Sequence, residues 1–203
     1  TGVFYWLRTR AYSPNGVMPT VKFGTTSLAN IIYQVPVYIT NSQSIATPNP
    51  FQQMIKIPIS QFSSYIFDNN TSANFEFYYP NGTIIPSWIE SVNSTTILVW
   101  LKLYSIPAQT TIKIYLGFTS KSTNLLSSSG TMGIGEAPQL SPKYGEYDDG
   151  GIVFNFYDNF AGTSLNTNKW ITVSAPPSGV ITVNNGVSVI NTENNVYYVS
   201  SKS

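Results

Sequence analysis

The sequence predicts an all-β protein on three observations. Apolar and polar residues alternate with a period of two along most of the 203 residues, and no stretch of about a dozen residues has a sustained helical period. Glycine, proline and asparagine interrupt this alternation at short intervals, as turns between strands do. Hydrophobic residues make up 42% of the chain, which is enough for a buried core. We therefore predict a β-sandwich of the immunoglobulin-like or jelly-roll type, with an amino-terminal extension strand and an incomplete second β-domain.

The first half of the chain contains most of the predicted strands. A strand at Val3–Arg10 is followed by a turn at Ser13–Gly16 and a strand at Val17–Phe23. Further strands are predicted at Ile31–Ile39, Met54–Ile59, Phe75–Tyr79, Ile84–Ile89, Ile97–Tyr104 and Thr111–Phe118. Pro36 lacks an amide donor and therefore marks an edge or a bulge. The clearest turn is the hairpin signal Pro80-Asn81-Gly82-Thr83.

The second half combines a predicted linker with shorter strands. Ser120–Gly135 is rich in Ser, Gly and Thr and lacks an apolar period, so it is interpreted as a linker. Strands are predicted at Gly151–Tyr157, Trp170–Val173, Val180–Val183, Val187–Ile190 and Val196–Ser200, with a hairpin turn at Asn184-Asn185-Gly186. The predicted domains are an extension and docking strand (1–30), a β-sandwich (31–119), a linker and acidic junction (120–150) and the start of a jelly-roll-like domain (151–203).

The composition excludes several classes of function. The chain has no histidine and no cysteine, and 9% of its residues are charged. A Ser-His-Asp triad, a thiolate nucleophile and the usual structural zinc sites are therefore excluded, and we predict no catalytic residue, no enzymatic activity and no cofactor. The basic residues are scattered singly at a net charge of +1, which argues against nucleic acid as a partner.

The same composition indicates an extracellular location. The longest apolar runs are far shorter than the roughly 20 residues that a membrane span needs. The first residue is Thr1 rather than methionine, so we expect a leader to have been removed. A surface made of neutral hydrogen-bonding groups titrates little and is little screened by salt, which suits a cell surface or a virion.

Six stretches between Val35 and Phe118 carry a family resemblance: Pro36–Asn41, Pro50–Met54, Phe75–Tyr78, Ile85–Glu90, Trp100–Leu103 and Ile114–Gly117. In this order they resemble a β-sandwich domain of unknown function found in secreted and cell-surface proteins of archaea and bacteria. That domain often precedes a concanavalin-like (laminin-G-like) jelly roll, and Phe156–Phe160 with Gly162–Trp170 resembles the opening of one. Only about 50 residues follow Asp149, too few for the roughly eight strands of a jelly roll.

This architecture resembles attachment spikes of archaeal viruses and subunits of archaeal surface filaments. The resemblance implies an extracellular structural and attachment protein, part of a virion tail spike or a pilus-like filament, that works through subunit contacts. The alternative is a carbohydrate-binding, lectin-like module in which exposed Trp88, Trp100 or Trp170 stack on sugar rings. Trp100 alternates with apolar neighbours, which favours a core position for it.

The first strand is a candidate for subunit docking through Val3, Phe4, Tyr5, Trp6 and Leu7. It precedes the recognisable domain and carries large apolar residues on both faces. It is either an ordinary strand of its own chain or a strand that adds to a sheet edge of another chain. We predict docking onto another copy or another subunit by strand exchange.

Four sequons predict N-glycosylation, at Asn69, Asn70, Asn81 and Asn93. About four would occur by chance in this composition, but all four fall within 25 residues at predicted turns or loops, where a glycan can be accommodated.

A second candidate site is the concentration of carboxylates at Glu146, Asp148, Asp149 and Asp158. Closely spaced oxygen ligands can hold Ca²⁺, but the spacing matches no EF-hand loop. Hydrogen bonding to turn amides is the favoured alternative, so no metal site is predicted. The Glu-x-Asp-x-x-Glu strand of concanavalin-like glycosidases is also absent.

Overall fold

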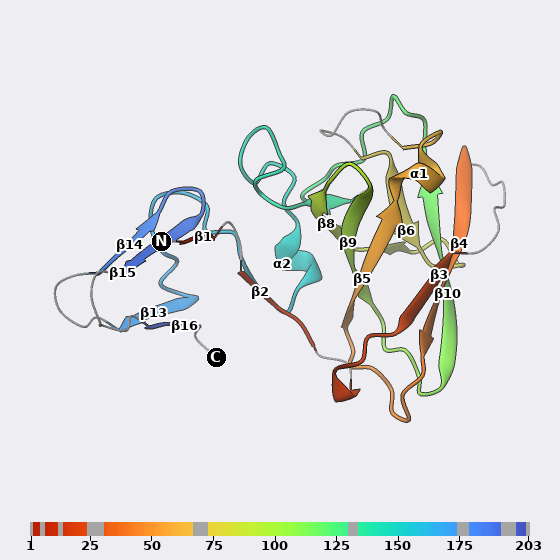
Figure 1. Cartoon of the computed structure of the whole chain (residues 1–203), viewed down its shortest axis with the longest axis horizontal. Coiled ribbons are helices and arrows are strands. Elements are labelled where there is room, and N and C mark those ends of the chain that lie inside the picture. Colours follow the sequence, from red (N-terminus) through yellow and green to blue (C-terminus); the bar gives the residue numbers. More distant parts are fainter. Residues whose placement is uncertain are drawn as a thin grey trace.

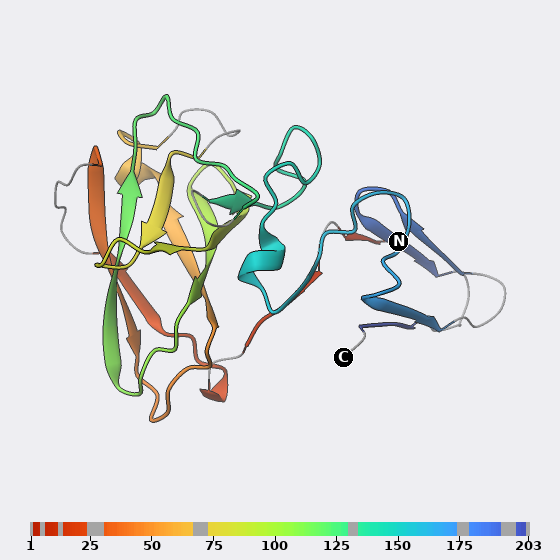
Figure 2. The ribbon, with the colours of Figure 1, turned by 180° about the vertical axis from the view of Figure 1, so that it is seen from behind.

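A computed structural model of the chain describes residues 2–4, 7–11, 14–23, 31–66, 73–129, 134–173, 179–191 and 198–201. These residues form two lobes (Figures 1 and 2). The larger, called the sandwich lobe, contains two packed sheets, and the smaller, called the second lobe, contains short antiparallel ladders. The predicted all-β fold class is confirmed, with antiparallel sheets packed as a sandwich.

One sheet of the sandwich lobe has the strand order β3-β4-β10-β6-β7, and neighbouring strands are antiparallel. Its strands are β3 (Thr20–Phe23), β4 (Tyr33–Asn41), β10 (Thr110–Phe118), β6 (Phe75–Tyr78) and β7 (Ile84–Ile85). The described ladder between β3 and β4 ends with Phe23 opposite Val37, one residue before Pro36. On its other side β4 pairs with β10, where Pro36 lies opposite Tyr115, and the edge or bulge expected at Pro36 stays a prediction.

The facing sheet has the order β11-β8-β9-β5, with β11 parallel to β8 and the other pairs antiparallel. Its strands are β11 (Gly135–Glu136), β8 (Ser87–Val92), β9 (Thr96–Leu103) and β5 (Phe51–Pro58). β11 and the buried Leu126 and Ile134 come from the region predicted as linker and acidic junction. These parts of the region therefore belong to the sandwich lobe. The sequence did not predict this, because isolated apolar residues among Ser and Gly form no periodic pattern.

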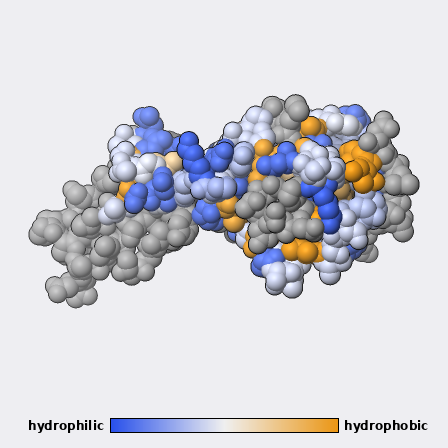
Figure 3. Space-filling model, turned by 90° about the horizontal axis from the view of Figure 1, so that it is seen from above, coloured by the Kyte–Doolittle hydropathy of each residue, from blue (hydrophilic) through white to orange (hydrophobic). Residues whose placement is uncertain are grey.

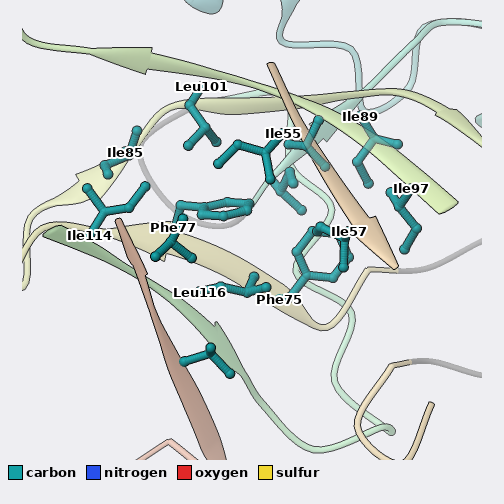
Figure 4. Packing of buried hydrophobic residues seen from close by; sticks show 14 of the residues in the cluster. Ile55, Ile57, Phe75, Phe77, Ile85, Ile89, Ile97, Leu101, Ile114 and Leu116 are labelled. Atoms are coloured by element: carbon teal, nitrogen blue, oxygen red, sulfur yellow. The ribbon is translucent and has the colours of Figure 1, made fainter. Parts of the chain in front are cut away.

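The main core lies between the two sheets (Figure 4). Alternate residues of each strand point into it, as the period of two requires. Fully buried examples are Val35, Val37, Ile39, Ile57, Phe77, Val99, Leu101, Ile114 and Leu116. Each large apolar side chain buried in this way contributes about 1.5–3 kcal/mol, so this core is a large source of stability for the sandwich lobe.

Two short helices were not predicted. α1 (Ile59–Phe62) follows β5 and buries Phe62 against Phe118, with ring centroids 5.4 Å apart. The strand predicted at Gly151–Tyr157 is helical at its start, where α2 (Gly150–Val153) forms. Only its end is extended, as part of β12 (Phe156–Asp158). An alternation of a few residues does not distinguish one helical turn from a strand. The packing of residues 150–153 against the sandwich lobe determines that they are helical.

The second lobe joins the two ends of the described chain. Its three-stranded sheet has the order β1-β15-β14, and β13 pairs with β16. The strands are β1 (Gly2–Phe4), β13 (Trp170–Val173), β14 (Gly179–Val183), β15 (Val187–Asn191) and β16 (Tyr198–Ser201). The predicted hairpin turn between β14 and β15 is confirmed, with φ of 47° at Asn185 and 130° at Gly186.

The strand predicted at Val3–Arg10 is divided into β1 and β2 (Leu7–Thr9). β1 belongs to the second lobe, while β2 pairs with β12 between the two lobes (Figure 1). The short 3-10 turn η1 (Pro14–Gly16) follows, with positive φ at Asn15 and Gly16, before β3 enters the sandwich. β3 was assigned to the extension, so the predicted boundary at residue 30 lies too far along the chain.

Candidate functional site: the seat of the amino-terminal segment

The outer face of the β8–β9 sheet carries a second buried cluster. Trp88 and Trp100 lie opposite each other in register. They point away from the main core because their neighbours Ile89, Val99 and Leu101 point into it. Ala137, Val153, Phe154 and Tyr157 cover the two indoles, which are 0% and 4% exposed. We call this covered outer face, with α2 and β12, the seat.

Arg8 of β2 lies on the aromatic rings of the seat. Its guanidinium carbon is 4.2 Å from the Trp100 ring centroid and 5.0 Å from that of Phe154. The guanidinium also forms an ion pair of 2.9 Å with Glu90, whose Oε2 accepts the indole N–H of Trp100 as well. Burial lowers the pKa of Arg8, and the hydrogen bond and charge of Glu90 oppose this shift. The arginine remains a cation, because the ordinary pKa of a guanidinium lies far above neutral pH.

Residues 2–4 and 7–11, here together called the amino-terminal segment, contact the second lobe and the sandwich lobe respectively. β1 pairs with β15 over three residues, and β2 pairs with β12 over three more. At its end, the amide of Ala11 donates to Gln52 Oε1 at 3.0 Å, and Gln52 Nε2 donates to the carbonyl of Val153 at 3.2 Å. The segment therefore contacts both lobes within about ten residues.

Asp148 is the polar centre of the junction beside the seat. Its carboxylate accepts hydrogen bonds from Trp88 Nε1 at 3.0 Å, from the Tyr157 hydroxyl at 2.9 Å and from Asn159 Nδ2 at 2.7 Å. The amide of Gly150 at the start of α2 donates to it at 3.0 Å. Burial and the neighbouring Asp148 charge raise the pKa of Tyr157, so its hydroxyl stays protonated and donates. Asp148 thus joins β8, α2 and β12.

The other three carboxylates of the predicted cluster do not converge on Asp148. Asp158 accepts from the Trp170 indole and from the amide of Phe160, with Lys169 Nζ at 3.8 Å. Glu146 is exposed. Within the described ranges, no group of three or more acidic side chains is placed to hold a metal ion. Asp148 and Asp158 instead bond turn amides, the alternative that the sequence favoured.

Asp149 is a buried carboxyl without a hydrogen-bond partner. It is 2% exposed, and neither of its oxygens has a partner in the structure. Its side chain lies against Gly135 so closely that a Cβ there would overlap its Oδ1. Burial, and secondarily the charge of Asp148, raises the pKa of Asp149 to about 8. The group is therefore largely protonated at neutral pH.

The tryptophans proposed for sugar binding do not form an open platform. Trp88, Trp100 and Trp170 are all at most 5% exposed, so the exposure required by the lectin-like alternative is wrong for them. α2 and β12 cover Trp88 and Trp100, while Trp170 packs with Phe160 and Val183 in the core of the second lobe. The core position expected for Trp100 is confirmed.

The remaining predicted sites are placed in part. Val3, Phe4 and Leu7 lie in backbone ladders with β15 and β12 of the same chain, and Tyr5 and Trp6 lie outside the described residues. Asn81 and Asn93 are exposed in turns. Asn69 and Asn70 also lie outside the described residues.

Arg8 and Glu90 were not identified from the sequence. A signal for Arg8 was present, because Arg8 and Arg10 share one face of a strand in a chain with few charges. If such a face is covered, its two cations need acidic or aromatic partners. The identity of those partners depends on residues about 80 to 150 positions away, which a local pattern does not reveal.

Comparison with known proteins points to archaeal viruses. The chain is 34% identical over 173 residues to the uncharacterized protein 562 of Sulfolobus islandicus rod-shaped virus 1. The match covers 79% of this chain and 28% of the viral protein, so the chain spans less than a third of that relative's length. No family model and no solved structure matches the chain. None of the described helices is long and apolar enough to span a membrane.

Proposed function

We propose that this chain belongs to a structural and attachment protein of an archaeal virus particle, exposed on the virion as a spike or filament component. The similarity to a protein encoded by an archaeal rod-shaped virus supports the viral origin. The observation that carries the mechanical role is the seating of the amino-terminal segment, which ties two β-lobes together through Arg8 and two short ladders. In this role the segment holds the two lobes together and provides contacts for assembly, and it takes part in no reaction.

Strand exchange between copies is the proposed mode of assembly. Each backbone ladder of the segment is three residues long, so the main-chain contribution to docking is small and Arg8 supplies much of the specificity. A segment held in this way can leave its own seat and enter that of a neighbour with the same register, because domain swapping preserves every contact. The seat then binds the amino-terminal segment of its own chain in a monomer and that of a neighbouring copy in a row of linked subunits.

The proposed role involves no catalysis. The junction carboxylates Asp148 and Asp158 are occupied by hydrogen bonds from indole, hydroxyl and amide groups of the fold itself. Asp149 is buried against Gly135. Turnover of a polysaccharide by the purified chain, lost on Asp149→Asn or Glu146→Gln, would contradict this part of the proposal.

Locating the protein in infected cells and purified virions tests the proposed function. Quantitative mass spectrometry of density-purified particles should find peptides of this chain at a constant ratio to the major coat protein. Labelling with an antibody against the sandwich lobe should decorate the outside of intact particles. Absence from particles, with the protein found only inside infected cells, would overturn the assignment.

A further inference from the structure

Asn81 lies in the exposed turn between β6 and β7. The turn is closed by the Tyr79 amide, which donates to the Thr83 carbonyl at 2.9 Å, and Gly82 has a φ of 84°. Asn81, Gly82 and Thr83 are all exposed. The side chain of Asn81 accepts the Thr83 amide through Oδ1 at 3.0 Å, so it stabilises the turn through its carbonyl.

Asn93 has the same arrangement in the turn between β8 and β9. Its Oδ1 accepts from the Thr95 amide at 2.9 Å, the Thr96 amide at 2.8 Å and the Thr95 hydroxyl at 3.0 Å. Asn93, Ser94 and Thr95 are exposed. In both turns the threonine two positions after the asparagine is therefore held next to it on the surface.

The buried asparagines Asn41 and Asn74 use their side chains differently. Asn41 and Asn74 are 0% exposed and donate through Nδ2, Asn41 to the carbonyls of Ile45, Ile106 and Pro107 and Asn74 to those of Tyr65 and Thr119. A substituent on Nδ2 would disrupt those contacts. At Asn81 and Asn93 the turn bonds engage Oδ1, so Nδ2 is left for a substituent while the fold is preserved.

We propose that Asn81 and Asn93 each carry an N-linked glycan. In the transfer, Nδ2 forms a bond to the anomeric carbon of a lipid-diphosphate-linked sugar, and the carbon–oxygen bond to the diphosphate breaks. One Nδ2 proton is released, and the lipid diphosphate leaves with the bonding electrons. The product amide keeps its carbonyl oxygen and one N–H, so the hydrogen bonds to Thr83, Thr95 and Thr96 persist.

The two glycans would lie at opposite ends of the sandwich. The Thr95 carbonyl accepts the amide of Ile59 at the start of α1, beside the beginning of β9. The turn of Asn81 lies near the other end of β9, where the Tyr104 amide donates to the Tyr79 hydroxyl. Bulky hydrophilic groups there would cover the ends of the lobe and leave the seat of the amino-terminal segment open.

Peptide mass spectrometry of the protein from native virus particles tests the proposal. Peptides that contain Asn81 and Asn93 should carry a carbohydrate mass, with sugar oxonium ions in their fragment spectra. Unmodified peptides at one position would overturn the assignment of that residue. Unmodified peptides at both positions would overturn the whole proposal.

Paired threonine variants, produced in the native host, identify the cause of the modification. Thr95→Ser and Thr83→Ser keep the hydroxyl and should retain the glycans, whereas Thr95→Ala and Thr83→Ala should lose them. A melting curve of each variant shows whether it is folded. A folded alanine variant that retains its glycan would contradict recognition through the sequon.

Discussion

The guanidinium of Arg8 lies 4.2 Å from the ring centroid of Trp100, and both residues bond the same oxygen of Glu90. The three residues come from β2, β9 and β8, so this single arrangement fixes the amino-terminal segment on the sandwich lobe. The Glu90 carboxylate neutralises the charge of Arg8 and also accepts the Trp100 indole N–H, in a region largely shielded from water. The side chains of Arg8 and Glu90 are only 17% and 21% exposed.

Removal of Arg8 should destabilise the chain. Arg8→Ala leaves the Glu90 carboxylate half-buried without its cation and removes the contact with Trp100, at a cost of about 2–4 kcal/mol in the free energy of unfolding. Arg8→Lys should recover part of this loss, because the charge returns but the planar group does not. Urea denaturation measures both. The exposed Lys56 is the control, and Lys56→Ala should change stability by less than about 0.5 kcal/mol.

The two neighbouring glycines of α2 should respond in opposite directions to alanine. A Cβ on Gly150 would lie 2.3 Å from Cζ of the Tyr157 ring, an overlap, whereas a Cβ on Gly151 meets nothing within 4 Å. Gly150→Ala should therefore destabilise by about 1–3 kcal/mol, because it overpacks the junction. Gly151→Ala should stabilise by about 0.5–1 kcal/mol through the unfolded state. Thermal melts of the two variants decide this, and equal effects would show that α2 is not packed as described.

Stability should fall as pH rises from about 4 to about 8 because of Asp149. Its pKa is about 8 in the folded chain and about 3.9 when unfolded. Below pH 4 the carboxyl is protonated in both states and has no effect. Between these values only the unfolded state ionises, so unfolding becomes easier, by on the order of a few kcal/mol in total. The loss is complete above the folded pKa.

Asp149→Asn should remove most of this pH dependence. The acidic and phenolic groups that influence Asp149 are Asp148 and Tyr157. The pKa of Glu136 is also raised by burial, so a smaller decline in the same direction should remain. The exposed Glu146 provides the control, and Glu146→Gln should preserve the decline due to Asp149 and alter only the part due to Glu136, because the charge of Glu146 helps to raise the pKa of Glu136. A profile that is identical in the wild type and Asp149→Asn would show that Asp149 ionises as freely when folded as when unfolded.

The sandwich strands could be predicted from the sequence because their alternation is long. β4, β5, β9 and β10 each contain eight or nine residues and place alternate residues in the main core, so the period of two is well sampled. The hairpin turns at Asn81-Gly82 and Asn185-Gly186 were predictable because their backbones need positive φ. α2 was not, since its form depends on packing over Trp88 and Trp100.

The seat could not be predicted for a different reason. Trp88 and Trp100 stand on the sheet face that a simple sandwich leaves to solvent, so the pattern alone suggested a sugar platform for Trp88. Only the path of the chain after β11 brings Phe154 and Tyr157 over them. Arg8 reaches the same place from the other end of the sequence. Contacts between residues this far apart leave no local periodicity in the sequence.

In the proposed assembly, the amino-terminal segment links neighbouring copies through the register seen within one chain. Val3 of β1 lies opposite Ser188 of β15. Opposite residues of antiparallel strands have Cα atoms about 4.5–5.5 Å apart, which a disulfide can span. Because the chain has no cysteine, Val3→Cys and Ser188→Cys introduce the only thiols.

The most direct measurement is therefore a mixed cross-linking experiment. A ¹⁵N-labelled Val3→Cys chain and an unlabelled Ser188→Cys chain are assembled together, oxidised and digested, and disulfide-linked peptides are analysed by mass spectrometry. Strand exchange between copies should yield a labelled peptide with Cys at position 3 joined to an unlabelled peptide with Cys at position 188. It would be contradicted if this linkage were absent from the assembled mixture while the double variant closed the same disulfide within a single chain.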